Sequence, residues 1–318
     1  MLALQDMADQ DLFICPRCAS PVLPADGAWH CSGAECRYAT EAFPVVAGVP
    51  ALVDFERSVL DADRLRSVAG ASEVARSRFA GPLRRLLHPA NTTAPKNVAR
   101  MVELLRADAG RTGRQPRILV VGGGTIGDGL EELYADPTID LVSFDVYASP
   151  AVQFIGDGHA IPLADGSLDG VIIQAVLEHV LEPTIVAAEI QRVLRVGGIV
   201  YADTPFLQQV HEGAYDFTRF TDSGHRYLFR GFERIDSGSV AGAGTALRWS
   251  VDYFVRALTR SVPAGRIVSL CFFWLSYLDR FLDPRHSVDA ASSVFFLGRR
   301  TERSISGADV IDYYQGGM

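Results

Sequence analysis

Residues 118–127 read Ile-Leu-Val-Val-Gly-Gly-Gly-Thr-Ile-Gly, an apolar run that ends in glycines. A buried strand with glycines at its end lets the backbone turn tightly and approach a ligand where a side chain would block it. A second apolar run at 141–144 precedes Asp145, about 20 residues beyond the glycines, and a carboxylate there can accept hydrogen bonds from two vicinal ribose hydroxyls. The two runs predict a βαβ unit that binds a cofactor carrying an adenosine.

The glycines alone do not identify that cofactor. Gly122, Gly124 and Gly127 fit the pattern G-x-G-x-x-G, which suits NAD as well as S-adenosylmethionine. An ordinary tight turn in an α/β sheet would also contain glycines, although the paired Asp145 argues against it. The residues that follow must therefore decide.

Four motifs follow in order between residues 156 and 198. They are Gly-Asp-Gly-His-Ala-Ile-Pro-Leu-Ala-Asp-Gly-Ser-Leu-Asp at 156–169, Val-Ile-Ile-Gln at 171–174, Leu-Glu-His-Val at 177–180 and Glu-Ile-Gln-Arg-Val-Leu-Arg-Val-Gly-Gly at 189–198. This succession closely resembles the class I S-adenosylmethionine-dependent methyltransferases of the type 11 group. The resemblance covers roughly residues 95–300. It implies a doubly wound, Rossmann-like α/β fold with a seven-stranded sheet, and S-adenosylmethionine as the cofactor.

The same resemblance implies roles for matching positions. Asp145 would contact the ribose, Asp157 the adenine amino group, and the backbone of Gly158 and His159 the adenine ring. The methionine part of the cofactor would lie against Gly122, Gly124 and Gly127, and further contacts would come from Gln174, Val176 and Leu177. The family usually carries an acidic residue where this chain has Val120, so the amino end of the methionine loses a customary anchor, which would weaken cofactor binding.

Four of the five cysteines lie in the first 36 residues. In a reducing compartment such crowding favours a metal, although two disulfides or four inert thiols are the alternative. The short-spaced pairs Cys15 with Cys18 and Cys31 with Cys36 can present four thiolates tetrahedrally to Zn²⁺. A domain of under about 40 residues rarely folds on burial alone, so the metal would supply stability. Zinc would be structural, because four thiolates leave no open position for water.

The segment at 43–53 is similar to the closing strand of zinc ribbons at the N-terminus of some ribosomal RNA methyltransferases, and to small methyltransferase-activator proteins. This resemblance predicts a zinc ribbon over residues 1–55 that positions a substrate or partner.

Composition bounds the remaining classes of function. The net charge of −8 argues against a protein whose whole surface binds nucleic acid. Positive charge gathers at 56–117, which holds 13 Lys or Arg and 6 Asp or Glu. We interpret residues 56–92 as a basic helical linker, with docking to an anionic surface as the alternative. The first 11 residues lack the basic start and apolar run of a signal peptide, so a cytoplasmic location is expected.

Residues 93–300 form the predicted methyltransferase domain, and the tail at 301–318 is expected to be flexible. Apolar runs at 199–204 and 293–298 predict two further buried strands.

A helical cap is predicted at 240–290, because this segment is too long for a simple crossover. Its run at 267–278 is largely apolar over about 12 residues, whereas a helix needs about 20 to span a bilayer. A buried cap helix or an interfacial, lipid-facing patch would explain this run. Cys271 within it is expected to be a core thiol.

Methyl transfer from a sulfonium is an in-line displacement, so the enzyme mainly aligns the nucleophile with the methyl group. A base is added where the acceptor must lose a proton. Residues 204–221 follow the strand that borders the expected acceptor pocket and combine His, Glu, Asp, Arg and aromatic side chains. The density of charge in this loop predicts catalytic residues, because buried charges need partners. Tyr215 and Phe217 are the predicted acceptor walls.

His211 is the predicted general base, oriented by Asp216 or Glu212. The alternative is a structural salt bridge between Asp216 and Arg219 beside an exposed His211.

His179 is a second catalytic candidate. The pair Glu178-His179 is similar to methyltransferases of quinone precursors and of small RNA 3′ ends, in which a Glu-x-x-Glu-His pattern and another His bind a divalent metal at the acceptor oxygen. Ala175 stands in place of the first Glu, and this departure counts against such a metal here.

The sequence predicts S-adenosylmethionine-dependent methylation of an oxygen in a small or lipid-linked metabolite, such as a saccharide, isoprenoid or natural-product intermediate. The apolar cap and the aromatic loop favour this acceptor, with peripheral membrane contact. A zinc ribbon and a basic linker would instead suit an RNA substrate, whose binding should weaken steeply with salt. A third hypothesis is a non-catalytic subunit that keeps the fold; Val120 and Ala175 favour it, while Asp145 and Asp157 speak against it.

Overall fold

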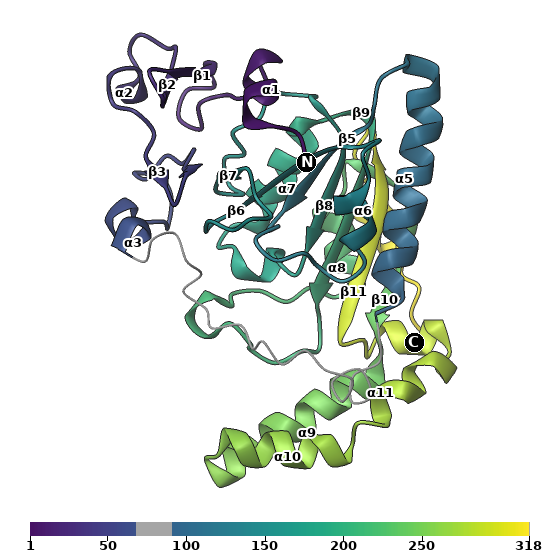
Figure 1. Cartoon of the computed structure of the whole chain (residues 1–318). Helices are drawn as coiled ribbons and strands as arrows, with labels where there is room; N and C mark the ends of the chain where they lie inside the picture. Colours follow the sequence, from purple (N-terminus) through teal and green to yellow (C-terminus); the bar gives the residue numbers. More distant parts are fainter. Residues whose placement is uncertain (68–90, 318) are drawn as a thin grey trace.

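The structure is a computed structural model that describes residues 1–67 and 91–317 (Figure 1). Most of the basic linker predicted at 56–92 therefore lies outside the described residues. Its described beginning contains the short helix α3 (Ala62–Ser67).

One seven-stranded sheet forms the centre of the fold, in the order β10-β11-β9-β8-β5-β6-β7. The strands from β5 to β9 run parallel, whereas β11 is antiparallel to both β9 and β10. The doubly wound α/β sheet expected from the sequence is confirmed. Its strands are β5 (Arg117–Val121), β6 (Asp140–Asp145), β7 (Phe154–Ile155), β8 (Leu168–Gln174), β9 (Leu194–Pro205), β10 (Phe232–Ala241) and β11 (Ser293–Arg300).

Side chains alternate along β5 between two hydrophobic layers. Ile118 and Val120 face the layer of α5 (Thr93–Thr112) and α6 (Glu131–Ala135), while Leu119 and Val121 face the layer of α7 (Pro183–Val193). All residues of β5 are buried, as expected for a parallel strand covered on both faces. Figure 1 shows α5 running along one side of the sheet.

The strand order reverses at β5, because the chain proceeds to β6 on one side and returns to β8 on the other. A crevice forms at such a switch point, beyond the carboxyl ends of the strands. The turn after β5 and the turn after β8 therefore border the same crevice.

The N-terminal segment packs onto the sheet and shares its hydrophobic core. The Phe13 ring lies 5.3 Å from that of Trp29 and 5.5 Å from that of Phe154 in β7, and the Leu52 amide donates to the Ile155 carbonyl at 2.9 Å. The closing strand expected at 43–53 is a short hairpin. The elements of the N-terminal segment are α1 (Leu4–Asp9), β1 (Val22–Ala25), β2 (Ala28–Cys31), α2 (Arg37–Thr40), β3 (Val45–Val46) and β4 (Val49–Pro50), of which β3 and β4 form the hairpin.

Helices fill the connection between β10 and β11, within the range predicted as a cap. They are α9 (Ala243–Thr259), α10 (Val262–Cys271), α11 (Leu275–Leu278), η3 (Asp279–Phe281) and α12 (Pro284–Val288). The apolar run at 267–278 is divided between α10 and α11, and Cys271 is exposed, so the expectation of a core thiol was wrong. Within the described ranges, no helix has the length and hydropathy needed to span a bilayer.

The tail expected to be flexible contains the helix α13 (Gly307–Tyr313). Ser306 and Asp309 form a capping box at its start, which pairs two backbone N–H groups that a helix end leaves free. The Tyr313 hydroxyl lies 2.8 Å from the Ser237 hydroxyl in β10. The cap sequence Ser-x-x-Asp explains why a helix forms here.

His225 in α8 (Asp222–Leu228) makes the stability of the fold depend on pH. Its ring is fully buried beside Phe229, and neither ring nitrogen has a hydrogen-bond partner among the described residues. Burial lowers the pKa of His225 from 6.5 to about 3. Between these values the unfolded state binds a proton that the folded state does not, so the free energy of unfolding falls as the pH drops below 6.5.

We expect His225→Phe to remove this dependence, which amounts to about 1.4 kcal/mol per pH unit. Denaturant unfolding at pH 7 and at pH 5 measures it. Wild-type and variant proteins that lose equal stability between these pH values would show that His225 is not the titrating group.

Candidate active site at the carboxyl edge of the sheet

The turn after β5 brings backbone close to the crevice. Gly122 has a φ of +76°, a left-handed conformation that favours glycine, and an added Cβ would lie 2.3 Å from Val176 Cγ2. The Gly124 amide donates a 2.8 Å hydrogen bond to Asp145 Oδ2 at the end of β6. A Cβ on Gly124 would lie only 2.6 Å from that oxygen. The glycine loop and the Asp145 carboxylate thus lie together and form one cradle.

Asp157 follows β7 and is buried. Its Oδ1 accepts from the His159 amide at 2.9 Å and contacts the His159 ring nitrogen Nδ1 at 2.6 Å, while its Oδ2 accepts from the Ser58 hydroxyl at 2.5 Å. Burial by itself would raise the pKa of Asp157, but the hydrogen bonds from His159 and Ser58 hold it below its usual value. No motif marked Ser58, which the packing of the N-terminal segment brings to this carboxylate.

Gln174 at the end of β8 points toward the glycine loop. A Cβ on Gly127 would lie 2.7 Å from Gln174 Oε1, which is buried and has no hydrogen-bond partner in the described part of the chain. The Gln174 amide nitrogen donates to Asp203 Oδ2 at 3.2 Å, and burial raises the pKa of Asp203 to about 6. Val120 packs in the core, so its position contributes no polar group.

These residues fit an adenosine-carrying cofactor. The cradle leaves no room for side chains on its glycines, Asp145 and Asp157 are acceptors, and Gln174 offers an unsatisfied buried oxygen. Gly158 lies beside Val186, and Leu177, just after β8, is fully buried.

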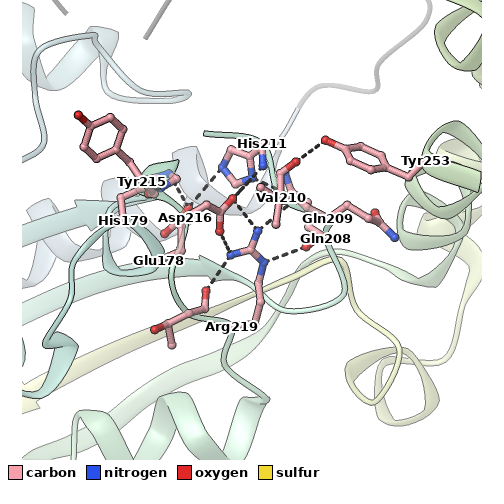
Figure 2. Close-up of polar contacts among 11 residues, drawn as sticks. Glu178, His179, Gln208, Gln209, Val210, His211, Tyr215, Asp216, Arg219 and Tyr253 are labelled. Carbon is pink, nitrogen blue, oxygen red and sulfur yellow. Dashed lines mark hydrogen bonds and ion pairs between the residues drawn. The ribbon is translucent and has the colours of Figure 1, made fainter. Parts of the chain in front are cut away.

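A second polar cluster begins where β8 ends. Glu178 and His179 lie in the 3₁₀ helix η1 (Leu177–His179), and His211 comes from the loop after β9 (Figure 2). The His179 and His211 Nε2 atoms lie 3.5 and 3.8 Å from Glu178 Oε1, and the two rings are 5.1 Å apart. The structure therefore brings together both histidines that the sequence singled out, with Glu178 between them.

Glu178 is fully buried, and neither carboxyl oxygen accepts a hydrogen bond from a described residue. Burial raises the pKa of this carboxyl to about 8. An unsatisfied buried carboxyl is costly. In the sequence Glu178 stands out only as part of a motif, because its burial depends on the loop that covers it.

Both histidines use Nδ1 for contacts on the far side of the ring. His179 Nδ1 lies 2.7 Å from the Tyr215 carbonyl oxygen, and His211 Nδ1 lies 3.3 Å from the Gln209 carbonyl and 3.4 Å from Asp216 Oδ2. These acceptors assign the proton to Nδ1 and leave the Nε2 lone pairs directed toward Glu178. Metal-binding histidines are commonly oriented in this way.

The three side chains could therefore hold a divalent cation, because their ligand atoms all lie within 4.8 Å of one another. Ala175, which stands where the Glu-x-x-Glu-His pattern would place its first Glu, has a φ of +50° and is exposed at the turn after β8. The cluster forms without a carboxylate at that position.

Asp216 connects His211 to Arg219, so the salt bridge of the alternative forms, but His211 is half-buried and not exposed. Asp216 Oδ2 accepts from the His211 amide at 2.8 Å and from Arg219 Nη2 at 2.9 Å, and Oδ1 accepts from Arg219 Nη1. Burial raises the pKa of Asp216, but these bonds lower it to about 2. The hydrogen bonds of the described residues thus join His211 to Asp216 and leave Glu212 aside. The predicted acceptor walls Tyr215 and Phe217 are exposed.

A groove of about 440 Å³ lies beside this loop, between the residues after β9 and the start of α9. The Tyr253 hydroxyl donates to the Val210 carbonyl (Figure 2), and Gln209 donates to Ser250 at 3.1 Å, so hydrogen bonds join α9 to the loop that carries His211. The groove is lined by Phe206, Leu207, Gln208, Gln209, Ala243, Ala246, Leu247, Ser250 and Ala290.

The four N-terminal cysteines converge, as predicted. Their sulfur atoms lie within 4.8 Å of one another, with 3.7 Å between Cys15 and Cys36 and 3.4 Å between Cys18 and Cys31. Tetrahedral zinc with Zn–S bonds of about 2.3 Å places its sulfur ligands about 3.8 Å apart. All four thiols are free of disulfides, so this donor set fits Zn²⁺.

Residues 130–202 match the family model described as a methyltransferase domain. An uncharacterized 37.1 kDa protein in transposon TN4556 of Streptomyces fradiae is 46% identical over 57 residues, and the demethylmenaquinone methyltransferase of Renibacterium salmoninarum is 38% identical over 92 residues. The alignments cover 18% and 26% of this chain, and only 16% and 38% of those relatives. A putative sarcosine dimethylglycine methyltransferase from Galdieria sulphuraria is 15% identical with a TM-score of 0.40, over 64% of this chain and 86% of that one.

Proposed function

We propose that this chain, which carries a class I methyltransferase domain, transfers the methyl group of S-adenosylmethionine to an oxygen of a small or lipid-linked metabolite. One observation carries the proposal. The glycine cradle contacts Val176, which immediately precedes the helix of Glu178 and His179, so cofactor residues and a polar cluster border the same crevice. Such adjacency is what a group-transfer site requires.

In this proposal the chain's residues bind and orient the reactants. Asp145 accepts hydrogen bonds from the ribose, and the glycine loop lets the cofactor approach the backbone. S-adenosylmethionine supplies an electrophilic methyl group to an acceptor placed in line with it. His211, oriented by Asp216 and Gln209, takes the acceptor proton at Nε2.

Acceptor activation by a metal is the second mechanism that the geometry supports. Glu178, His179 and His211 would hold a divalent cation, which would favour the ionised form of an acceptor hydroxyl. The observation that favours it is that neither carboxyl oxygen of Glu178 has a hydrogen-bond partner among the described residues. In that case His211 serves as a ligand and is unavailable as a base.

The groove and α9 support an apolar or lipid-linked acceptor. Apolar side chains from Phe206, Leu207 and Leu247 line the groove, which lies next to the loop of His211. RNA remains the alternative acceptor. Labelled methyl transfer from S-adenosylmethionine into the organic extract of cell material, compared with its RNA fraction, tests the proposal. Binding of S-adenosylhomocysteine without transfer to either fraction would favour a non-catalytic subunit.

His211→Gln is expected to lower kcat by about 100-fold to 10,000-fold, the usual contribution of a positioned base. Binding of S-adenosylhomocysteine should be unchanged, because His211 lies outside the glycine cradle. His286→Gln, an exposed histidine in α12, is the matched control. Full activity in His211→Gln would exclude both mechanisms.

Glu178→Gln separates the two mechanisms through a readout besides activity. If the cluster holds a metal, calorimetric or electron paramagnetic resonance titration with Mn²⁺ should show one site in the wild type that Glu178→Gln weakens. If His211 acts alone, no Mn²⁺ binds there, and Glu178→Gln should keep most of the activity.

A further inference from the structure

The helices α9 and α10 form a hairpin that extends away from the sheet at the bottom of Figure 1. Its polarity is reversed relative to an ordinary surface hairpin, which buries apolar side chains and exposes polar ones. The buried residues of α9 include Arg248 and Asp252, and those of α10 are Gly265 and Ser269.

Polar contacts and small residues join the two helices. Arg248 Nε of α9 donates to the Ser269 hydroxyl of α10 at 3.3 Å, while Asp252 pairs with Arg256 within α9 at 2.6 Å. An added Cβ on Gly265 would lie 2.4 Å from Asp252 Oδ1, so the helices approach closely at that glycine. Small residues and hydrogen bonds between helices are typical of packing in an apolar medium.

Several large apolar side chains of the hairpin point outward. On α9, Leu247, Phe254 and Leu258 are 52%, 68% and 73% exposed, and their spacing places them on one face. Further exposed large apolar residues in the following helices are Val262, Ile267, Leu270, Trp274, Leu278 and Phe281. Burial of apolar surface drives folding in water, but here these side chains stay exposed. The hairpin therefore needs an apolar partner.

Charge indicates which partner fits. Residues 243–288 hold six Arg and three Asp, a local charge of +3 in a chain of −8. Arg260 lies at the turn between the helices, and Arg266 is exposed beside Leu270. Neither forms an ion pair with a described residue. An apolar face bordered by arginines complements a membrane surface that contains anionic lipids.

We propose that the α9–α10 hairpin and α11, called here the apolar hairpin, insert into the surface of an anionic lipid membrane. At 1.5 Å per residue α9 is about 25 Å long and α10 about 15 Å, too short to cross, so they lie in the interface. A second copy of the chain would also cover the face. A twofold interface, however, would bring the same arginine-bordered patches together, which like charge disfavours.

The apolar hairpin lies next to the candidate active site. Ser250 and Tyr253 of α9 are hydrogen-bonded to the loop of His211, and Leu247 belongs both to the exposed face and to the groove. A lipid-linked acceptor could therefore pass from the membrane into the groove. This last step rests on the proposed function, whereas membrane binding does not.

Co-sedimentation of the full chain with vesicles tests the inference. We expect binding to phosphatidylcholine vesicles that contain phosphatidylglycerol and weaker binding to phosphatidylcholine alone. Phe254→Ser with Leu258→Ser should weaken binding at least about tenfold, since membrane affinity scales with buried apolar area. Arg260→Glu with Arg266→Glu should abolish the preference for phosphatidylglycerol. Ile311→Ser, at an apolar residue of α13 that is 78% exposed, is the control and should bind like the wild type.

Equal binding of wild type and the Phe254 and Leu258 double variant would overturn the inference. So would a wild-type chain that ignores vesicles but forms a dimer that the double variant loses, since the partner would then be a second copy. S-adenosylhomocysteine binding in the same samples keeps the two proposals distinct. Vesicle binding without cofactor binding would uphold the membrane surface and reject the methyltransferase.

Discussion

Asp145→Ala is expected to weaken binding of S-adenosylhomocysteine by about 100-fold to 20,000-fold. A carboxylate that accepts hydrogen bonds from two ribose hydroxyls makes two charge-assisted bonds, each contributing about 1.5–3 kcal/mol. Every 1.4 kcal/mol is about a tenfold change in affinity. The variant also removes the acceptor of the Gly124 amide, so the cradle itself should loosen.

Isothermal calorimetry measures this loss, with NADH as the competing cofactor. Asp140→Ala is a matched control, because Asp140 begins the same strand at the opposite edge of the sheet. Its affinity for S-adenosylhomocysteine should equal that of the wild type. If Asp145→Ala and Asp140→Ala bind alike, Asp145 is not the ribose acceptor. If the wild type binds NADH in preference, the cofactor assignment fails.

The convergence of the proposed cofactor residues could be predicted from sequence because each of them ends a strand or lies just after one. In a parallel sheet the carboxyl ends of strands meet at one edge, so Gly122, Asp145, Asp157 and Gln174 converge once the strands are recognised. Ser58 could not be predicted in this way. It reaches Asp157 only through the packing of the N-terminal segment, and no local pattern records that contact.

The polar cluster was predictable only in part. His179 and His211 were singled out by motif and by charge density, but their pairing requires the loop after β9 to fold back over η1. The amides of Phe217 and Thr218 donate to the Glu178 carbonyl and fix this fold. The role of Glu178 follows from its complete burial, a tertiary property.

The orientation of the apolar hairpin could not be predicted from the sequence either. Periodicity indicates that α9 has an apolar face, but it does not tell whether that face turns toward the protein or away from it. Here α10 packs against the polar side, because Gly265 and Ser269 admit the close approach that Arg248 and Asp252 require. The buried cap helix considered from the sequence was therefore wrong for Ile267, which is 64% exposed.

If the four N-terminal cysteines hold zinc, as their arrangement suggests, its removal is expected to have the largest effect on stability. Structural zinc contributes roughly 10–16 kcal/mol of binding free energy in small four-ligand sites. Cys15, Cys31 and Cys36 belong to a core cluster that also contains Phe13, Trp29 and Phe154, so this energy would support the edge of the large sheet as well as the N-terminal segment. Because the segment shares the core of the sheet, loss of zinc should lower the melting temperature of the whole protein, whereas in an isolated zinc domain it would affect that domain alone.

Cys31→Ser tests this expectation, because Cys31 ends β2 and its sulfur lies 3.4 Å from that of Cys18. Elemental analysis should find about one zinc per chain in the wild type, as four thiolates complete one tetrahedral site, and much less in Cys31→Ser. Hydrogen exchange should accelerate across residues 13–53 and at β7, which packs against them, while β5 stays protected. Cys271→Ser removes the exposed thiol of α10 and should leave the zinc content unchanged. Retention of zinc in Cys31→Ser, or unchanged exchange at 13–53, would show that the four cysteines do not hold the segment together.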